Sequence, residues 1–575
     1  MRVRPFDRSR FTRSQPTDGD AARIRRILAN ANRYALTTWW HTVRDYDAQT
    51  GDHLDLGGIA EPNIRPPASE AYALAVALAT GAYSARSTGV SERTAREMTA
   101  KLVRSLAFHH RVNTEGGWGY DWQTALWAAL AGNAGWLVWH DLSETDQHHV
   151  WRMVEFEANR FLGWPLPYWR NRAGRYTGAC GDTKAEENAW NSRLLFLAGV
   201  MMPWHSRRAG WAYKAAELSI GAFARPSDVD NQRVVRGRPV GDWLEGTNIN
   251  EDGSLVNHNI YHPDYVTTIS EMVSGGLVYG LAGRRIPVNA LHGLPVLYES
   301  LVDKPWWPSP DRPCPNSPGF LPPTAANPTG TMYVPGSDDV YYPQGNDWGT
   351  MRRAHFAELD AMAGVFRAHR GAGAWERRHA KRVLDMQRRP LPGGQASDGS
   401  TYRSPEEDTY SGREEWVAAR AAETWLTHWL AHHGALRTTN AADQIVVCNT
   451  DRGVAVTGRW TVGSPAVNGP QVFGTGVRYK AAGTGEASVR FTPRLTATRT
   501  YDVYAWWISS DSQASDAPYT VEHTRGTTTV RVDQRTGGGA WHRLGTFTLG
   551  PGGNVLLTDD ADGYVVADAV RLRPR

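Results

Sequence analysis

The residue types that can transfer protons gather in one stretch of the chain, residues 241–265. This stretch holds His258, His262, Tyr261 and Tyr265 together with four asparagines and five acids. Histidine and tyrosine side chains take up and release protons, and an asparagine amide can hydrogen-bond a carboxylate. A long polar segment needs partners for its backbone groups outside a regular ladder, and ordered loops of this kind are commonly functional. These histidines could instead only bond loop carbonyls, but the crowding of His, Tyr and Asn favours a catalytic loop.

A second group of polar residues lies at 180–193, CGDTKAEENAWNSR. We predict that Asp182 caps a helix, which puts Glu186 and Glu187 in the first turn, where acids compensate the helix dipole. That explanation covers the two acids but leaves the neighbouring amides and the tryptophan unexplained. We predict Asn191 as a catalytic partner of a substrate carboxylate, and as substrate contacts Glu187, Asn188, Trp190 and Arg193.

Two aromatic segments are candidates for the rim of the same site. Residues 341–348 end a long loop before a helix that carries Arg352, and residues 116–122 open an earlier helix. For Asp347 we favour a helix cap, because Asp is a preferred capping residue. Trp348 and Arg352 are predicted substrate contacts, as are Trp118 and Trp122 at the cleft edge. Together with Asn257 and His262 from the central stretch, these residues complete the predicted binding set.

The frame for these segments is predicted to be helical. Apolar residues recur at three- and four-residue spacing in 21–44, 68–86, 92–110, 121–138, 143–161, 183–201, 264–282, 349–369 and 412–433. Ser91 and Ser143 are predicted caps. Many helices joined by long loops favour a toroid of helical hairpins, an (α/α) toroid, whose loops line a cleft at one end. We divide the chain into an N-terminal extension (1–20), this catalytic domain (21–437) and a third part.

The third part, 443–575, has the pattern of an all-β sandwich. Short alternating runs, such as 501–507 and 528–534, are separated by Gly, Asp and Asn, which is typical of short strands joined by turns. The fold class is therefore multidomain, a helical toroid followed by a β-sandwich.

Composition excludes several classes of protein. At 575 residues and 41% apolar residues the chain can bury large cores. No apolar run is long enough to insert in a membrane, and a net charge of +4 with interspersed signs gives no basic stripe for nucleic acid. The chain has 25 Trp but only 13 Phe. Indole rings stack on sugars, although tryptophan also fills helical cores.

The cysteines and the N-terminus bear on the compartment. Cys180, Cys314 and Cys448 form no CxxC pair, so zinc and thioredoxin chemistry is unsupported and one disulfide of open pairing is allowed. Residues 1–20 are basic and polar and show no signal peptide. The chain is therefore either cytoplasmic or lacks a leader that was removed.

The β part resembles the golvesin or xanthan-lyase C-terminal domain. The motifs that carry the resemblance appear in order and cover nearly all of 443–575: TGRW at 457–460, YDVYAWW at 501–507, VDQ at 532–534, WHRLG at 541–545 and ADAV at 567–570. Domains of this family are typically attached to extracellular enzymes that degrade polysaccharides. The resemblance therefore implies a secreted protein.

The central stretch resembles an element of the α/α-toroid polysaccharide lyases, the hyaluronate, chondroitin and xanthan lyase group. Residues 252–258, DGSLVNH, are similar to the DGSF-x-QH element, in which the His acts with a later Tyr at the sugar. Here Asn257 replaces the Gln. Tyr261 and Tyr265 follow His258 by three and seven residues, not by the nine that are usual in that group, so the choice between the two tyrosines stays open.

The chemistry of β-elimination agrees with these residue types. Cleaving a uronic acid polymer in this way needs a base for the C5 proton, a partner that neutralises the adjacent carboxylate, and an acid for the leaving oxygen. We predict a polysaccharide lyase with His258 as base or neutraliser, Tyr265 or Tyr261 as base and acid, and Asn or Arg at the carboxylate. The substrate is then an acidic polysaccharide, and no cofactor is required.

Two other functions remain open. A toroidal glycoside hydrolase needs only two carboxyl groups, here among Glu186, Glu187, Glu251, Asp252 and Asp347. A non-catalytic carbohydrate-binding protein would also fit the β part and the tryptophans. A structural Ca²⁺ is a further expectation, near residues 228–231 or near the acids of 182–191, because hard cations take oxygen ligands. The oligomeric state and the polymer stay open.

Overall fold

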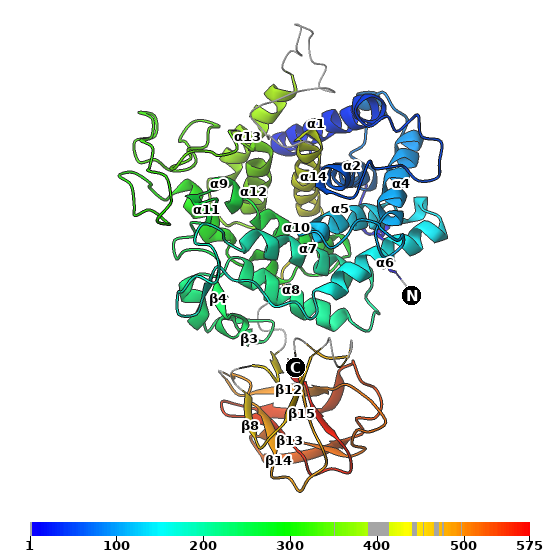
Figure 1. Ribbon diagram of the computed structural model, residues 1–575, viewed down its shortest axis with the longest axis vertical. Helices are drawn as coiled ribbons and strands as arrows, with labels where there is room; N and C mark the ends of the chain where they lie inside the picture. Colours follow the sequence, from blue (N-terminus) through cyan, green and yellow to red (C-terminus); the bar gives the residue numbers. More distant parts are fainter. Residues whose placement is uncertain are drawn as a thin grey trace.

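The computed structural model describes residues 3–349, 351–388, 413–439 and 445–575, apart from 452–453, 465–467, 469–470, 474–475 and 496. Helices fill the chain up to residue 432 and strands dominate after residue 445, so the fold is α plus β as predicted. Figure 1 shows the strands gathered in a separate body beyond α8 and β3. None of the described helices is long and apolar enough to cross a membrane.

The helices of the first part differ in number from the predicted set. They are α1 (Gly19–Tyr34), continued by a π-helical stretch (Ala35–Val43), α2 (Glu61–Thr80), α3 (Ala85–Thr88), α4 (Glu92–Phe108), α5 (Thr124–Leu137), α6 (Glu144–Arg160), α7 (Ala185–Met201), α8 (Arg208–Ala222), α9 (Pro263–Val266), α10 (Ile269–Leu281), α11 (Leu294–Val302), α12 (Arg353–Val365), α13 (Ala372–Gln387) and α14 (Arg413–His432). The prediction missed α8, α11 and α13.

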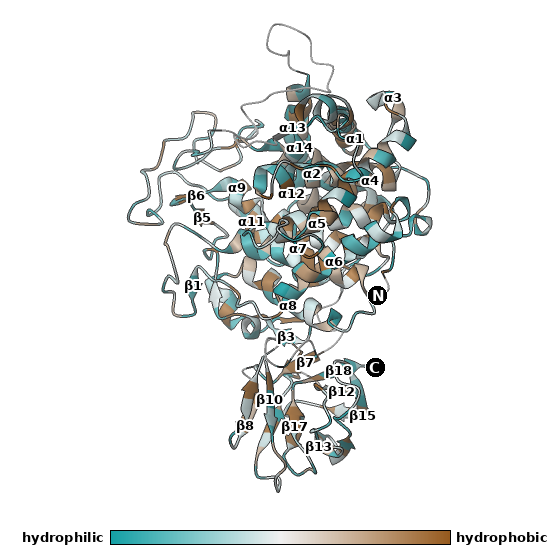
Figure 2. Cartoon of the chain, turned by 45° about the vertical axis from the view of Figure 1, so that its right-hand side comes forward, coloured by the Kyte–Doolittle hydropathy of each residue, from teal (hydrophilic) through white to brown (hydrophobic). Residues whose placement is uncertain are grey.

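Six helices pack in a closed cycle of neighbours. Helix α2 contacts α5, α5 contacts α7, α7 contacts α10, α10 contacts α12, α12 contacts α14, and α14 returns to α2. Helices α5, α7 and α10 are buried on nearly every side, which is expected of helices that are apolar all round. Figure 2 shows α5 and α7 in the middle of this part, with many hydrophobic residues. Helices α1, α4, α6, α8 and α13 pack against this cycle.

Helix α2 begins earlier than its pattern predicts. It starts at Glu61 rather than at residue 68 and contains Pro66 and Pro67. A proline inside a helix leaves the carbonyl four residues before it without its usual donor. The carbonyl of Pro62 instead accepts a hydrogen bond from the Arg44 guanidinium at 3.1 Å. This contact replaces the hydrogen bond that Pro66 removes.

The predicted helix caps had mixed outcomes. The side chains of Ser91 and Ser143 accept bonds from the backbone amides of Thr94 and Asp146, so both caps are confirmed. The predicted cap at Asp182 is wrong, because α7 begins at Ala185 after Lys184. Asp182 instead pairs with the Lys184 ammonium at 2.5 Å and forms a backbone bridge with residue 257.

Long loops between the helices carry only short strands. These are β1 (Arg170–Asn171), β2 (Val234–Val235), β3 (Arg238–Pro239), β4 (Gly246–Thr247), β5 (Val256–Asn257) and β6 (Ile260–Tyr261). They form three two-stranded pairs, β1 with β4, β2 with β3, and β5 with β6. Among the described residues between α11 and α12 no helix or strand occurs.

The second part is built of antiparallel strands around one core. The strands are β7 (Ile445–Cys448), β8 (Val454–Thr457), β9 (Thr461–Gly463), β10 (Val477–Lys480), β11 (Ser488–Phe491), β12 (Arg499–Trp506), β13 (Ala517–His523), β14 (Gly526–Val532), β15 (His542–Leu549), β16 (Asn554–Thr558), β17 (Val565–Ala567) and β18 (Ala569–Pro574). Their sheets have the orders β14-β13-β16-β11-β8, β15-β12-β18-β7 and β17-β10-β9. Buried side chains such as Val503, Tyr519 and Leu557 fill the space between them.

The two parts share a buried interface. Tyr213 and Trp243 of the helical part belong to one apolar cluster with Cys448, Phe473 and Trp506 of the β part. Beside it, the Arg238 guanidinium lies 2.5 Å from the Asp451 carboxylate, and both side chains are almost fully buried. We name these residues the interdomain contact. It fixes the β part against α8 and the β2–β3 pair.

Candidate active site

His258 lies at the tip of the β5–β6 hairpin. The strands pair Val256 with Tyr261 and Asn257 with Ile260, which leaves a two-residue turn. His258 and Asn259 both have positive φ, 51° and 65°, as a type I′ hairpin turn requires. Asn accepts this conformation readily, whereas His adopts it less often. The turn thus places His258 at the outermost position of the hairpin.

The hairpin is held against the segment that precedes α7. The amide of Thr183 donates to the Val256 carbonyl at 3.1 Å, and the amide of Asn259 donates to the Gly181 carbonyl at 3.1 Å. A Cβ on Gly181 would lie 2.1 Å from the Asn259 side chain, so a side chain at this position would displace the turn. The position of His258 is therefore set by backbone contacts on two sides.

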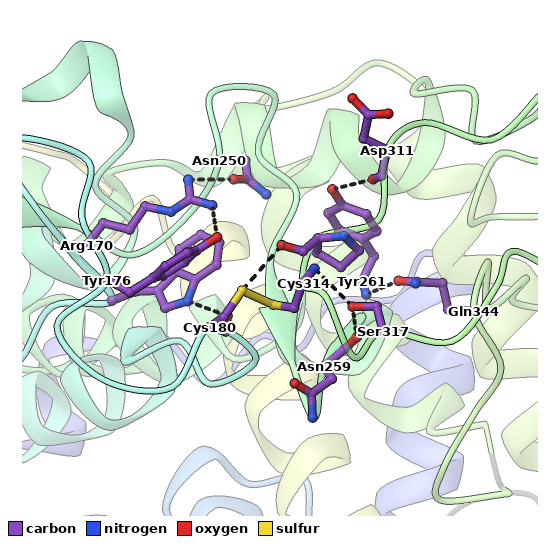
Figure 3. Close-up of a disulfide and its surroundings, with 12 residues drawn as sticks. Arg170, Tyr176, Cys180, Asn250, Asn259, Tyr261, Asp311, Cys314, Ser317 and Gln344 are labelled. Carbon is purple, nitrogen blue, oxygen red and sulfur yellow. Dashed lines mark hydrogen bonds between the residues drawn. A yellow bond between two sulfur atoms is a disulfide. The ribbon is translucent and has the colours of Figure 1, made fainter.

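A disulfide, Cys180–Cys314, joins the same segment to the loop between α11 and α12. Figure 3 shows it beside the hairpin. The Ser317 hydroxyl accepts from the Cys314 amide at 3.1 Å and donates to the Asn259 carbonyl at 2.5 Å. Further along the loop, the Gln344 side chain accepts from the Tyr261 amide at 2.9 Å. The loop that follows the disulfide is thus attached to the hairpin at several points.

That attachment brings Asp347 to His258. One carboxylate oxygen of Asp347 lies 2.5 Å from His258 Nδ1 and the other lies 3.1 Å from His262 Nε2. On its other side His258 Nε2 lies 3.1 Å from the hydroxyl of Tyr265, which is on α9. The helix cap favoured for Asp347 is wrong, because α12 begins only at Arg353, after Arg352. A carboxylate, an imidazole and a phenol therefore form one hydrogen-bonded chain.

The electrostatics of this chain keep Asp347 ionised. Burial alone would raise the pKa of its carboxyl group. The hydrogen bonds from His258 and His262 outweigh that effect and hold the pKa below its usual range. An ionised Asp347 can accept hydrogen bonds from both rings, which orients the imidazole of His258.

Two cavities meet at Tyr265. One, of about 110 Å³, is lined by Arg65, Trp190, Trp348, Arg352 and other residues, and the second, of about 400 Å³, is lined by His258, Asn257 and Glu187 among others. Trp122, Glu186 and Tyr265 line both. Burial, together with the neighbouring Glu187, raises the pKa of the Glu186 carboxyl well above its ordinary value. The cavities therefore combine cations, aromatic faces and a carboxyl group that tends to be protonated.

Most of the predicted residues lie at these cavities. The Trp348 ring is 4.7 Å from the His262 ring and 5.5 Å from the Tyr265 ring, and the Arg352 guanidinium stacks on it at 3.1 Å. The rings of Trp122 and Trp190 are 5.2 Å apart. The predicted residues brought together are His258, Tyr265, His262, Asn257, Glu187, Trp190, Trp122, Trp348 and Arg352.

Other predicted residues lie away from the cavities. Trp118 is fully buried and its indole donates to the Leu106 carbonyl at 2.9 Å. Asn188 is buried and donates to the Pro167 carbonyl at 3.0 Å. Arg193 is buried between the carboxylates of Glu271 and Glu423. These contacts give the three side chains packing partners inside the protein.

Tyr261 and Asn191 also lie outside both cavity linings. The Tyr261 ring packs on Trp306 at 4.6 Å and its hydroxyl lies 3.5 Å from the Asp311 carbonyl. It therefore faces the loop after α11, whereas Tyr265 faces His258. Asn191 is buried on α7, one turn beyond Glu187, which does line a cavity.

Sequence reasoning missed several residues of the site. Arg65 of α2 lies over the Trp416 ring at 3.5 Å, and both line the smaller cavity with His355. Arg65 was not predicted to be helical, because the prolines that follow it in α2 disfavour a helix. For Asp347 the available signal was its place among the polar and aromatic residues of 341–348.

The carboxylates of the alternative functions have partners of their own. Glu251 accepts from the amide and hydroxyl of Ser227 at 2.9 and 2.5 Å. Asp252 pairs with the Lys304 ammonium at 2.6 Å. Neither lines a cavity described above. The carboxylate of Asp228, considered for Ca²⁺, accepts from Asn231 at 2.9 Å and from Arg225 at 3.2 Å. The Ca²⁺ expectation stays a prediction.

Comparison with known proteins identifies the β part. Residues 445–574 match the Golvesin C-terminal domain family. The xanthan lyase of Bacillus sp. (strain GL1) is 42% identical over 137 residues, which are 22% of this chain and 14% of that protein. The structure of Paenibacillus xanthan lyase aligns with a TM-score of 0.23 at 36% identity, over 24% of this chain and 14% of that chain. A Podospora anserina GH26-CBM35 β-(1,4)-mannanase aligns with a TM-score of 0.19 at 16% identity, over 23% of this chain and 28% of that chain. The chain thus spans about one seventh of the xanthan lyases that it matches.

Proposed function

We propose that this protein, which carries a Golvesin C-terminal domain, is a polysaccharide lyase that cleaves a uronic-acid-containing polymer by β-elimination. The observation that carries the proposal is the hydrogen-bonded chain from Asp347 through His258 to Tyr265, whose hydroxyl lies where two cavities meet. The likeness of the β part to xanthan lyase supports the same class of activity. The closed cycle of helices is in our proposal the inner ring of an (α/α) toroid.

In this proposal Tyr265 handles the proton. Its oxygen removes the C5 proton while its own hydroxyl proton passes to His258 Nε2, 3.1 Å away. The C5–H electrons form the C4=C5 double bond, the C4–O bond breaks, and the leaving oxygen takes up a proton from the Tyr265–His258 pair. Asp347 holds His258 with Nδ1–H toward the carboxylate, which leaves Nε2 free to accept the proton.

The substrate carboxylate needs a positive or hydrogen-bonding partner before C5 can lose its proton. Arg352 and Arg65 line the smaller cavity and supply fixed cations. Asn191, one turn along α7 from a cavity residue, stays our proposed amide partner. Trp122, Trp190 and Trp348 offer flat apolar faces on which sugar rings stack.

One observation favours a second candidate, a glycoside hydrolase. Glu186 lines both cavities and its pKa is raised well above the ordinary value. A protonated carboxylic acid at a sugar site is the usual general acid of glycosidases. The lyase is favoured because hydrolysis leaves the Asp347–His258–Tyr265 chain without a role.

We also propose that the protein works outside the cell. The match to the Golvesin C-terminal domain supports this location, because that family's resemblance implies secretion. The Cys180–Cys314 disulfide supports it too, because such bonds persist mainly in oxidising compartments.

The test is a near-ultraviolet absorbance assay on a panel of uronate polysaccharides, because elimination creates an absorbing C4=C5 uronate and hydrolysis does not. Tyr265→Phe removes only the hydroxyl and is expected to lower kcat about 100- to 10,000-fold. His258→Asn suits the positive-φ turn, so its expected loss of activity reports chemistry rather than folding. Matched controls are Tyr564→Phe and His140→Asn, both exposed and far from the site in sequence. New reducing ends without absorbance would instead establish the hydrolase.

A further inference from the structure

We propose that His258, His262 and Asp347 form a binding site for a divalent transition-metal ion such as Zn²⁺. One ligand atom from each residue lies within 4.8 Å of the other two. The histidines come from the β5–β6 hairpin and the residue just before α9, and Asp347 comes from the loop before α12. Contacts from the disulfide region attach that loop to the hairpin, so the three ligands are held together before any ion binds.

The surroundings of His262 point to an ion between the ligands. Its ring is fully buried, with Nε2 3.1 Å from Asp347 Oδ1 and Nδ1 3.6 Å from Asp264 Oδ2. A neutral imidazole carries a single N–H. In either tautomer one carboxylate would therefore face the lone pair of the other ring nitrogen. A second ring proton or a cation at Nε2 removes this conflict, and with a cation Nδ1 carries the proton and points it toward Asp264.

The outer contacts have the arrangement that metal-binding histidines show. A ligating histidine normally donates its second N–H to a carboxylate or another acceptor, which fixes the ring. The Asp264 carboxylate lies on this side of His262, 3.6 Å from Nδ1, and accepts from the Tyr342 hydroxyl at 2.7 Å. For His258, whose Nδ1 faces Asp347, the second nitrogen faces the Tyr265 hydroxyl at 3.1 Å. On the side away from the proposed ion, His258 thus has a hydrogen-bonding partner and His262 has a nearby carboxylate.

The donor set selects the class of ion. Two imidazoles and one carboxylate suit Zn²⁺ and other first-row divalent ions, whereas Ca²⁺ and Mg²⁺ prefer oxygen ligands alone. Three protein ligands leave one position of a tetrahedron open. His258 also lines the 400 Å³ cavity, so water or a substrate oxygen can reach that position.

Occupation of this site would change the direction of the His258–Tyr265 hydrogen bond. With Nδ1 bound to the metal, Nε2 carries the proton of the neutral ring and can no longer accept one from Tyr265. The metal and the proton transfer therefore exclude each other, and we expect Zn²⁺ to inhibit elimination. This consequence for activity rests on the proposed function, whereas metal binding itself does not.

The test measures binding without substrate. The full-length protein is treated with a chelator, dialysed and titrated with ZnCl₂ by calorimetry. We expect one Zn²⁺ per chain with a Kd of about 1 µM or lower, and a heat that varies with the buffer because binding releases protons. His258→Asn, Asp347→Asn and His262→Gln should each weaken binding more than about 100-fold, since even residues behind the ligands contribute 10- to 100-fold.

A second group of potential ligands provides the control. His53, Asp146 and His149 also lie within reach of one ion. His149→Gln should leave the affinity unchanged. Loss of binding in His149→Gln but not in Asp347→Asn would overturn the assignment, as would equal binding by wild type and all three site variants. Circular dichroism checks folding, and the exposed positions of His258 and Asp347 make two of the variants safe in this respect.

The two proposals can fail separately. Zinc binding without elimination on any polymer would retain the metal site and refute the lyase. Elimination by a chain that binds no zinc would retain the lyase and refute the metal site.

Discussion

Breaking the Cys180–Cys314 disulfide is the perturbation with the clearest expected size. The bond joins the segment before α7 to the loop that carries Asp347, across 134 residues of sequence. Around it, the Ser317 hydroxyl contacts Asn259, next to His258. The double variant Cys180→Ser/Cys314→Ser removes the cross-link and leaves these polar contacts in place. It should therefore affect both stability and the site.

The magnitude follows from the length of the closed loop. In the chain-entropy treatment a loop of 134 residues corresponds to about 5 kcal/mol at 25 °C. The described helices run from Gly19 to His432. With an unfolding entropy of about 2.1 cal/mol/K per residue over that length, the loss lowers Tm by about 6 °C.

The assay is differential scanning calorimetry of the full chain, with and without reductant, alongside the absorbance assay. Reductant should lower the Tm of the helical part in the wild type and leave the double variant unchanged. Cys448 is buried, so a thiol reagent should react with the folded, oxidised protein only weakly. We expect kcat to fall more than KM rises, because the loop then holds Asp347 beside His258 for less of the time.

An equal Tm for the wild type and the double variant, in both redox states, would refute this reasoning. It would mean that hydrogen bonds alone fix the loop, or that the unfolded chain is already compact enough to gain nothing from the cross-link.

Three further outcomes are expected. Arg193→Met should lower the free energy of unfolding by about 3–5 kcal/mol, because the buried Glu423 loses its guanidinium partner and Glu271 keeps only Arg420. The kcat of the folded fraction should stay unchanged, and a selective rise in KM would restore Arg193 as a substrate contact. Glu186→Gln should raise Tm relative to wild type at pH 8 but not at pH 4. The reason is that a carboxyl group with a raised folded pKa stabilises the fold below its unfolded pKa of about 4.5, and this stabilisation is lost as pH rises through the folded pKa. Equal changes in Tm at both pH values would contradict this prediction. Asp451→Ala should lower the free energy of unfolding by about 3–5 kcal/mol, because it leaves the buried Arg238 charge without its partner. The two parts should then melt separately in calorimetry, whereas a single unchanged transition would count against the interdomain contact.

Local patterns were sufficient for much of the fold. The helix caps at Ser91 and Ser143 depend on contacts three residues away, and both are confirmed. The alternating runs at 501–507 and 528–534 overlap β12 and β14, which begin two residues earlier. Helix α2 was placed too late because its prolines act as helix breakers unless a distant group, here Arg44, satisfies the freed carbonyl.

The site depended on contacts that no local pattern encodes. His258 and Tyr265 are close in sequence and were both predicted, but their partner Asp347 lies 89 residues from His258. An aspartate can either cap a helix or orient an imidazole, and the predicted helix began close to Asp347 in sequence. A helix cap was therefore the stronger prediction from local sequence. The predicted cap at Asp182 was also wrong because of a contact distant in sequence: its backbone pairs with the hairpin instead of starting α7.

The interdomain contact has a consequence for how such proteins exchange parts. Modules joined by flexible linkers can be recombined freely, because neither surface depends on the other. Here a β module transplanted without Arg238, Tyr213 and Trp243 would expose Phe473 and Trp506 to water and leave Asp451 without its cation. Recombination between relatives should therefore succeed only when both faces are inherited together, and substitutions on one face should be matched on the other.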